Sequence, residues 1–133
     1  MYIHPKLVNF NQNLESLFHE VDGIVEDKWG DSYPLHPNRP SRGSTGNPEM
    51  DGLFDIAPDF TPGFGSQQGR GYRISVRMAT LEQVPKAERE SLLDEVAALV
   101  DQRLPRFFPD RNLQVVRDGN GYKIVGDFSL GDL

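Results

Sequence analysis

The chain has 133 residues, of which 37% are hydrophobic and 26% charged; its formal net charge is −6 and it contains no cysteine. This length and composition predict one folded domain over residues 1–133, and they exclude wholesale disorder, a disulfide framework, a thiolate zinc site and a cysteine nucleophile. The acidic balance disfavours non-specific binding to nucleic acid, and no apolar run approaches the roughly 18 residues that span a bilayer, so we expect neither partner.

Apolar residues at spacings of three and four predict a first amphipathic helix of about 20 residues. Pro5 suits its first turn, and Trp29-Gly30 is expected to close it. The apolar stripe comprises Leu7, Phe10, Leu14, Leu17, Val21 and Ile24. Acidic residues are expected mostly away from this stripe, at Glu15, Glu20, Asp22 and Glu26. His4 and His19 are expected at the surface.

Residues 32–71 look like neither a helix, a strand nor an ordinary loop. They contain six prolines and seven glycines, with arginine, serine and aromatic residues among them. Connections longer than about 12 to 15 residues are uncommon in compact domains and are usually functional or disordered. We therefore expect this segment to be where the protein works.

Two strands are predicted around the end of this segment. Residues 72–78 alternate apolar and polar side chains, which is typical of a half-buried strand. Residues 52–57 are a candidate partner strand, with Pro58 expected to stop it. In that pairing Asp55 would lie opposite Arg73 or Arg77 on the sheet face.

A second helix is predicted from Pro85 to Pro105, where proline should halt it. Its apolar face comprises Leu92, Leu93, Val96, Ala97, Leu99, Val100 and Leu104. A β-hairpin follows over residues 113–125, because Asp-Gly and Asn-Gly favour tight turns. The order α-β-β-α-β-β indicates an α+β fold, a four-stranded, mostly antiparallel sheet with both helices on one face.

The other sheet face should carry Val116 and Val125 beside Arg73, Ser75 and Arg77. Two valines beside two arginines make a poor solvated surface. We expect the long segment, or a partner, to cover part of this face.

Two glycine-rich runs are candidate ligand loops. Residues 42–46 would form an anion nest, because glycine frees backbone N–H groups to converge, but a plain surface turn is the simpler alternative. Residues 64–72 do not match the dinucleotide fingerprint, since that loop opens a helix and this one opens a strand. A loop pinned by Phe60 and Phe64 is the favoured interpretation.

Arginine is the sole cation type between residues 32 and 80, and its planar fork suits carboxylates and phosphates. The leading hypothesis is a non-enzymatic binding or assembly module that presents these arginines to an acidic ligand or protein partner, a second copy of the chain included. The predicted binding residues are Arg39, Arg42, Arg70, Arg73 and Arg77.

The alternative is a small enzyme acting on an anionic substrate, a phosphoester or a carboxylate. His36, Asp51 or Asp55 would be its acid–base group, with Arg39 and Arg42 stabilising developing charge. No cofactor and no metal site is predicted. The N-terminal residues lack a basic stretch followed by an apolar one, so a cytoplasmic location is expected.

Overall fold

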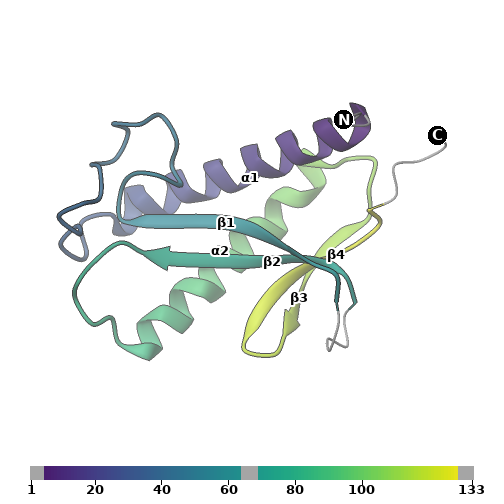
Figure 1. Cartoon of the computed structure of the whole chain (residues 1–133). Coiled ribbons are helices and arrows are strands. Elements are labelled where there is room, and N and C mark those ends of the chain that lie inside the picture. Colours follow the sequence, from purple (N-terminus) through teal and green to yellow (C-terminus); the bar gives the residue numbers. More distant parts are fainter. Residues whose placement is uncertain (1–4, 64–68, 129–133) are drawn as a thin grey trace.

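The computed structural model describes residues 5–63 and 69–128, with side chains from residue 8 onward. Two helices and four strands alternate as predicted (Figure 1). They are α1 (Pro5–Trp29), β1 (Phe54–Thr61), β2 (Gly71–Met78), α2 (Lys86–Phe107), β3 (Leu113–Asp118) and β4 (Gly121–Gly126). The α+β fold predicted from the sequence is confirmed. His4 and residues 64–68 lie outside the described residues.

The four strands form one antiparallel sheet in the order β1-β2-β4-β3. The register places Phe54 opposite Met78 and Tyr72 opposite Ile124, so these residues share one face. That face joins both helices in a single core, in which Leu17, Phe18, Val21, Phe54, Ile56, Val96, Val100, Leu104 and Ile124 are buried. Both helices therefore pack on the same side of the sheet. None of the described helices is long and apolar enough to cross a membrane.

Pro58 and Pro105 do not end the strand and the helix that they were expected to end. β1 continues through Pro58 to Thr61. The N–H of Ala79 donates to Leu53 O, and the residues of β1 point alternately toward β2 and away from it. Pro58 is one that points away, so its missing N–H removes no hydrogen bond between the two strands. α2 likewise continues through Pro105 to Phe107. Pro105 lacks the N–H that would bond the carbonyl of Asp101, but the helical bonding resumes after it, since the N–H of Phe108 donates to Leu104 O at 2.8 Å.

The polar side of α1 is not wholly solvated, which corrects the expectation for its acidic residues. Asp22 and Glu26 are buried, with exposed fractions of 2% and 6%. Helical periodicity places them beside the apolar stripe, and the edge of β1 covers them. His19 is also partly covered, since its side chain is only 28% exposed.

Candidate functional site

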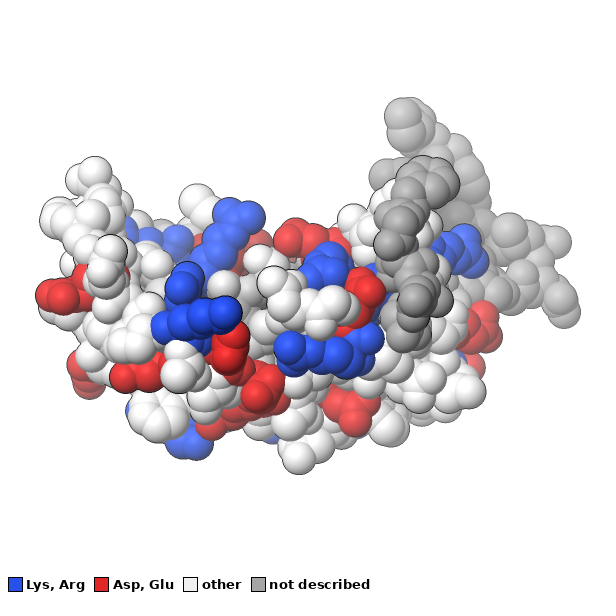
Figure 2. All heavy atoms as spheres, turned by 90° about the horizontal axis from the view of Figure 1, so that it is seen from below, with Lys and Arg blue, Asp and Glu red and all other residues white. Residues whose placement is uncertain are grey.

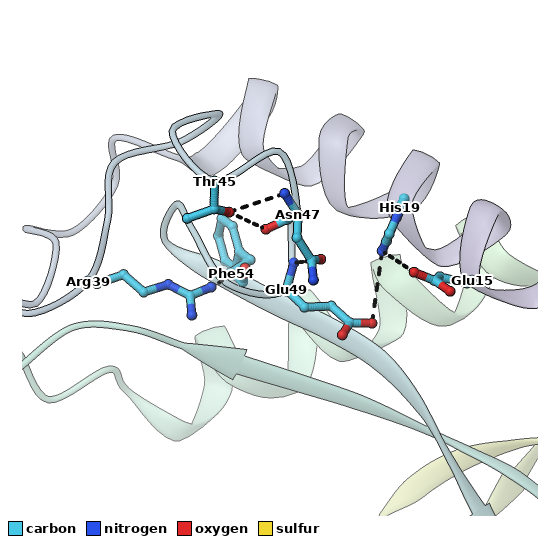
Figure 3. A network of polar contacts seen from close by, with 7 residues as sticks. All are labelled: Glu15, His19, Arg39, Thr45, Asn47, Glu49 and Phe54. Atoms are coloured by element: carbon cyan, nitrogen blue, oxygen red, sulfur yellow. Dashed lines mark hydrogen bonds and ion pairs between the residues drawn. The ribbon is translucent and has the colours of Figure 1, made fainter.

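Arg39 anchors the irregular segment that precedes β1. Its guanidinium donates to three carbonyls, those of Gly52 at 2.9 Å, Asp51 at 3.0 Å and Phe54 at 3.2 Å. Figure 3 shows it reaching from the loop to the start of β1. All three acceptors are backbone groups of the same chain, so the fork of Arg39 is occupied within the fold.

The run at residues 42–46 does fold around an anion, and that anion belongs to the chain. The hydroxyl and the backbone N–H of Thr45 donate to Asp51 Oδ2 at 2.7 and 3.1 Å. Burial raises the pKa of Asp51, but hydrogen bonds from Thr45 and Gly43 outweigh it and the net shift is downward. Gly43 and Gly46 adopt the positive φ angles that such convergence requires. The loop thus makes an internal nest.

Along the outer edge of β1, side chains make the backbone hydrogen bonds that a neighbouring strand would otherwise make. The N–H of Phe54 donates to Glu26 Oε1 at 2.7 Å, while its carbonyl accepts from Arg39. The N–H of Ile56 donates to Asp22. At the opposite edge of the sheet, the N–H of Val115 donates to Asp101 Oδ1 of α2 at 3.1 Å. Each helix therefore lends a carboxylate to an edge strand.

Burial raises the pKa values of Asp22 and Glu26, the two buried carboxyls of α1. Desolvation, with the nearby charge of Glu26 as the second cause, raises the pKa of Asp22 to about 8. Desolvation also raises the pKa of Glu26, although the N–H of Phe54 opposes it. Asp22 Oδ2 is buried with no hydrogen-bond partner among the described residues. At neutral pH this carboxyl is therefore protonated.

His19 lies between two glutamates on the same side of the molecule (Figure 3). Its Nε2 is 3.6 Å from Glu15 Oε1 and 4.0 Å from Glu49 Oε1. Desolvation raises the pKa of Glu49, and His19 opposes that shift. Within residues 5–63 and 69–128, no group of three His, Asp or Glu side chains is placed to hold a metal ion.

The sheet face opposite the helices carries a buried lysine. Lys123 has an exposed fraction of 0%; its Nζ donates to Gly69 O at 2.6 Å and lies 3.2 Å from Asp118 Oδ2. Arg73 pairs with the same carboxylate at 3.0 Å. The described end of the β1–β2 connection therefore covers this face near β4, and Val116 and Val125 are half-buried.

The remaining predicted residues are dispersed. Arg42 pairs with Asp27 at 2.5 Å, and Arg70 is exposed beside the β1–β2 connection. His36 Nδ1 accepts the N–H of Asn38 at 3.0 Å. No described contact joins His36 to Asp51 or Asp55. Arg39, Arg42 and Arg73 thus each contact a different acceptor group of the chain.

β2 is paired along its whole length on one side but only briefly on the other. β4 pairs with it at Tyr72 and Arg73 alone, while β1 pairs with all eight residues. Beyond these two pairs the β3–β4 hairpin diverges (Figure 1). Along β2, backbone groups point alternately to β1 and away from it, and Ala79 points to β1, since its N–H donates to Leu53 O. The backbone groups of Val76 and Met78 therefore point to the β4 side, and no described residue bonds them.

A hollow of about 1060 Å³ lies along that unpaired edge. We call it the β2 groove. Its walls are Val76, Arg77 and Met78 of β2, the connection after β2, the first half of α2 and Asn120 of the hairpin turn. The half-buried side chains of Leu92 and Leu93 contribute apolar surface. A strand-like segment is the shape that fits beside such an edge.

The charges of the β2 groove differ in balance from those of the whole chain. Three basic residues line it against two acidic ones, Glu82 and Glu90; the basic residues are Arg77, Lys86 and Arg89. The guanidinium of Arg77 makes no hydrogen bond or ion pair with any described residue, although Asp55 lies opposite Arg77 in the register. Figure 2 shows basic and acidic side chains lying next to one another on the face in view.

Sequence reasoning found Arg77 but missed the rest of the β2 groove. Lys86 and Arg89 belong to no motif in the sequence, and the tertiary structure places them in one lining with Val76 and Met78. It also missed a second hollow beside Trp29 and Tyr33, which we call the aromatic cavity. A tryptophan at the predicted end of a helix was the available signal.

Comparison with known proteins agrees with the observed extent of the fold. A family model described as an uncharacterised protein matches residues 5–126. An uncharacterized protein of Borreliella burgdorferi (strain ATCC 35210 / DSM 4680 / CIP 102532 / B31) is 41% identical over 122 residues, covering 90% of this chain and 95% of that protein. No solved structure matches significantly. The chain belongs to this family of uncharacterised proteins.

Proposed function

We propose that the protein is a non-enzymatic binding module whose β2 groove captures an extended, acidic segment of a protein partner. The observation that carries this proposal is the unpaired half of β2. Val76 and Met78 direct backbone donors and acceptors into a groove beside the apolar side chains of Leu92 and Leu93. An added strand would satisfy those backbone groups and bury alternate side chains against α2.

The basic side chains of the β2 groove support the proposal that the segment bound there is acidic. Arg77, Lys86 and Arg89 line the β2 groove in a chain whose net charge is −6. α2 begins at this groove, and its N-cap residue Pro85 provides no side-chain hydrogen bond to the first turn. The free N–H groups there add positive potential. A partner carboxylate would find its complement at Arg77, whereas Arg39 and Arg42 are already engaged within the fold.

A second copy of the chain is one source of such a segment, since its own carboxylates are in excess. Sedimentation velocity over a range of concentrations tests this source. Self-association that Arg77→Glu abolishes would identify the partner as the chain itself, whereas a monomer at all concentrations would assign the β2 groove to a different protein.

The experiment is amide hydrogen exchange by NMR with a panel of acetylated heptapeptides that alternate Glu or Asp with Val, Ile or Thr. Without peptide, the amides of Val76 and Met78 should exchange faster than those of Ser75 and Arg77, which bond β1. An acidic peptide should protect Val76 and Met78. Arg77→Glu should weaken binding at least about tenfold.

Arg70→Glu is the matched control, because Arg70 is an exposed arginine at the other end of the β1–β2 hairpin. It should leave affinity unchanged. The proposal is wrong if no acidic peptide protects the amide of Val76, or if the corresponding lysine peptides bind equally well.

A further inference from the structure

A second hollow, separate in chemistry from the β2 groove, lies between the end of α1 and the first half of α2. This aromatic cavity has a volume of about 500 Å³, within the range of small-molecule sites. Its apolar lining comes from three distant parts of the sequence, through Phe54, Met78, Val84 and Leu92. These side chains offer an uncharged surface to the body of a small ligand.

Hydrogen bonds hold two aromatic rings in place at the aromatic cavity, the exposed ring of Trp29 and the half-buried ring of Tyr33. The indole N–H of Trp29 donates to Glu95 Oε2 at 2.9 Å, although the residue is 41% exposed. The hydroxyl of Tyr33 donates to Glu88. A large exposed ring fixed by a polar contact is a preorganised binding surface, because little further side-chain freedom is lost on binding.

The charge of the aromatic cavity is negative. Glu88 and Glu95 line it, and its described lining includes no Lys or Arg. α1 ends at Trp29, so the carbonyl end of that helix adds negative potential nearby. A cation is therefore favoured here, in contrast to the β2 groove.

The ammonium group of Lys28 already contacts Glu95 and the ring of Trp29 beside the aromatic cavity. Lys28 Nζ lies 2.8 Å from Glu95 Oε1 and 5.0 Å from the centroid of the Trp29 ring. A carboxylate and an indole face together are the usual receptors of an ammonium group. Lys28 itself is 55% exposed, so its ammonium can move into water when another cation arrives.

We propose that the aromatic cavity binds a small organic ammonium ion with an apolar body. The body contacts Phe54, Met78 and Leu92, and the ammonium group meets Glu88, Glu95 and the ring of Trp29 in competition with Lys28. The linings of the two hollows share Met78, Val84 and Leu92, but the aromatic cavity does not include Arg77, on which the proposed function depends.

Trp29 is the chain's one tryptophan, so intrinsic fluorescence reports directly on this site. The probes are phenethylammonium and hexylammonium, with phenylpropanoate as a control of similar size and opposite charge. Both amines should give a saturable change, and phenylpropanoate should bind at least about tenfold more weakly. Glu88→Gln and Glu95→Gln should each weaken amine binding about fivefold or more.

Two further variants sharpen the test. Lys28→Met should tighten amine binding, because it removes the internal competitor for Glu95. Glu90→Gln, which removes an acidic residue of the same helix that is absent from the aromatic cavity's lining, should leave the affinity unchanged. The NMR signal of the Trp29 indole N–H should shift with the amines as an independent readout.

The inference is overturned if neither amine gives a saturable change, if phenylpropanoate binds as well as the amines, or if Lys28→Met weakens binding. Arg77→Glu separates this result from the first proposal. It should weaken peptide binding at the β2 groove at least about tenfold while leaving amine binding unchanged, so the failure of one proposal can be told from the failure of the other.

Discussion

The outer edge of β1, and the part of β2 beyond its two pairs with β4, are both strand edges without a neighbouring strand. Their backbone groups nevertheless differ in whether side chains bond them. At β1, Glu26 and Arg39 bond the N–H and the carbonyl of Phe54. At β2, no described group bonds the backbone of Val76 or Met78. An unpaired edge invites association with another chain.

The difference separates two uses of charge in one small domain. Around β1, charged side chains are buried and replace a missing strand, so they contribute to folding. Around β2, Arg77 is exposed and uncommitted to any described residue, so it is free for a partner. Substitutions at the two edges should therefore affect stability at β1 and association at β2.

The largest effect is expected at Glu26. Glu26→Ala leaves the buried N–H of Phe54 without an acceptor, which should lower the free energy of unfolding by about 3 kcal/mol. Chemical denaturation measures it. Glu15→Ala on the same helix, at an exposed position, should change it by less than about 0.5 kcal/mol. Equal effects of the two variants would show that Glu26 does not protect the edge.

A somewhat smaller loss is expected for Arg39. Arg39→Ala removes three hydrogen bonds to carbonyls and should destabilise the fold by about 2 kcal/mol. Arg77→Ala is the matched arginine variant at the other edge and should cost less than about 0.5 kcal/mol. Thermal unfolding of both variants decides the comparison, which fails if Arg77→Ala is the more damaging.

Over a single pH unit, the smallest effect comes from Asp22, whose pKa is raised from 3.8 to about 8 by burial and by the charge of Glu26. Between these values the folded state holds a proton that the unfolded state has lost. Its stabilising contribution is therefore complete below pH 4 and declines as pH rises toward 8, by up to about 1.4 kcal/mol per pH unit.

Asp22→Asn should flatten that decline, since the amide mimics the protonated carboxyl and can still accept the N–H of Ile56. Glu26 on α1 and Asp55 on β1 raise the pKa of Asp22, and Arg39 opposes them. Because burial also raises the pKa of Glu26, part of the slope should persist in the variant. Denaturation at a series of pH values tests this. An unchanged slope would mean that Asp22 is ionised in the folded protein.

The order of elements could be predicted because it depends on local periodicity. Spacings of three and four mark α1 and α2, and alternation marks β2. The Asp-Gly and Asn-Gly pairs mark the β3–β4 turn. The arrangement of charged residues could not be predicted in the same way. Arg39 and Arg77 have the same side chain within one stretch of sequence, but one is bound to three carbonyls and the other lines a groove.

By itself, the sequence determined an acidic α+β domain with the order α-β-β-α-β-β and both helices on one face. Only the tertiary structure decided that Asp22, Glu26 and Lys123 would be buried, that β4 would leave β2 after two pairs, and that Trp29 would stand beside α2. The physical reason is the separation, along the chain, of the residues on which each feature depends. Periodicity records how each residue relates to its near neighbours, whereas burial of a charge and the opening of a groove depend on contacts between residues far apart in the chain.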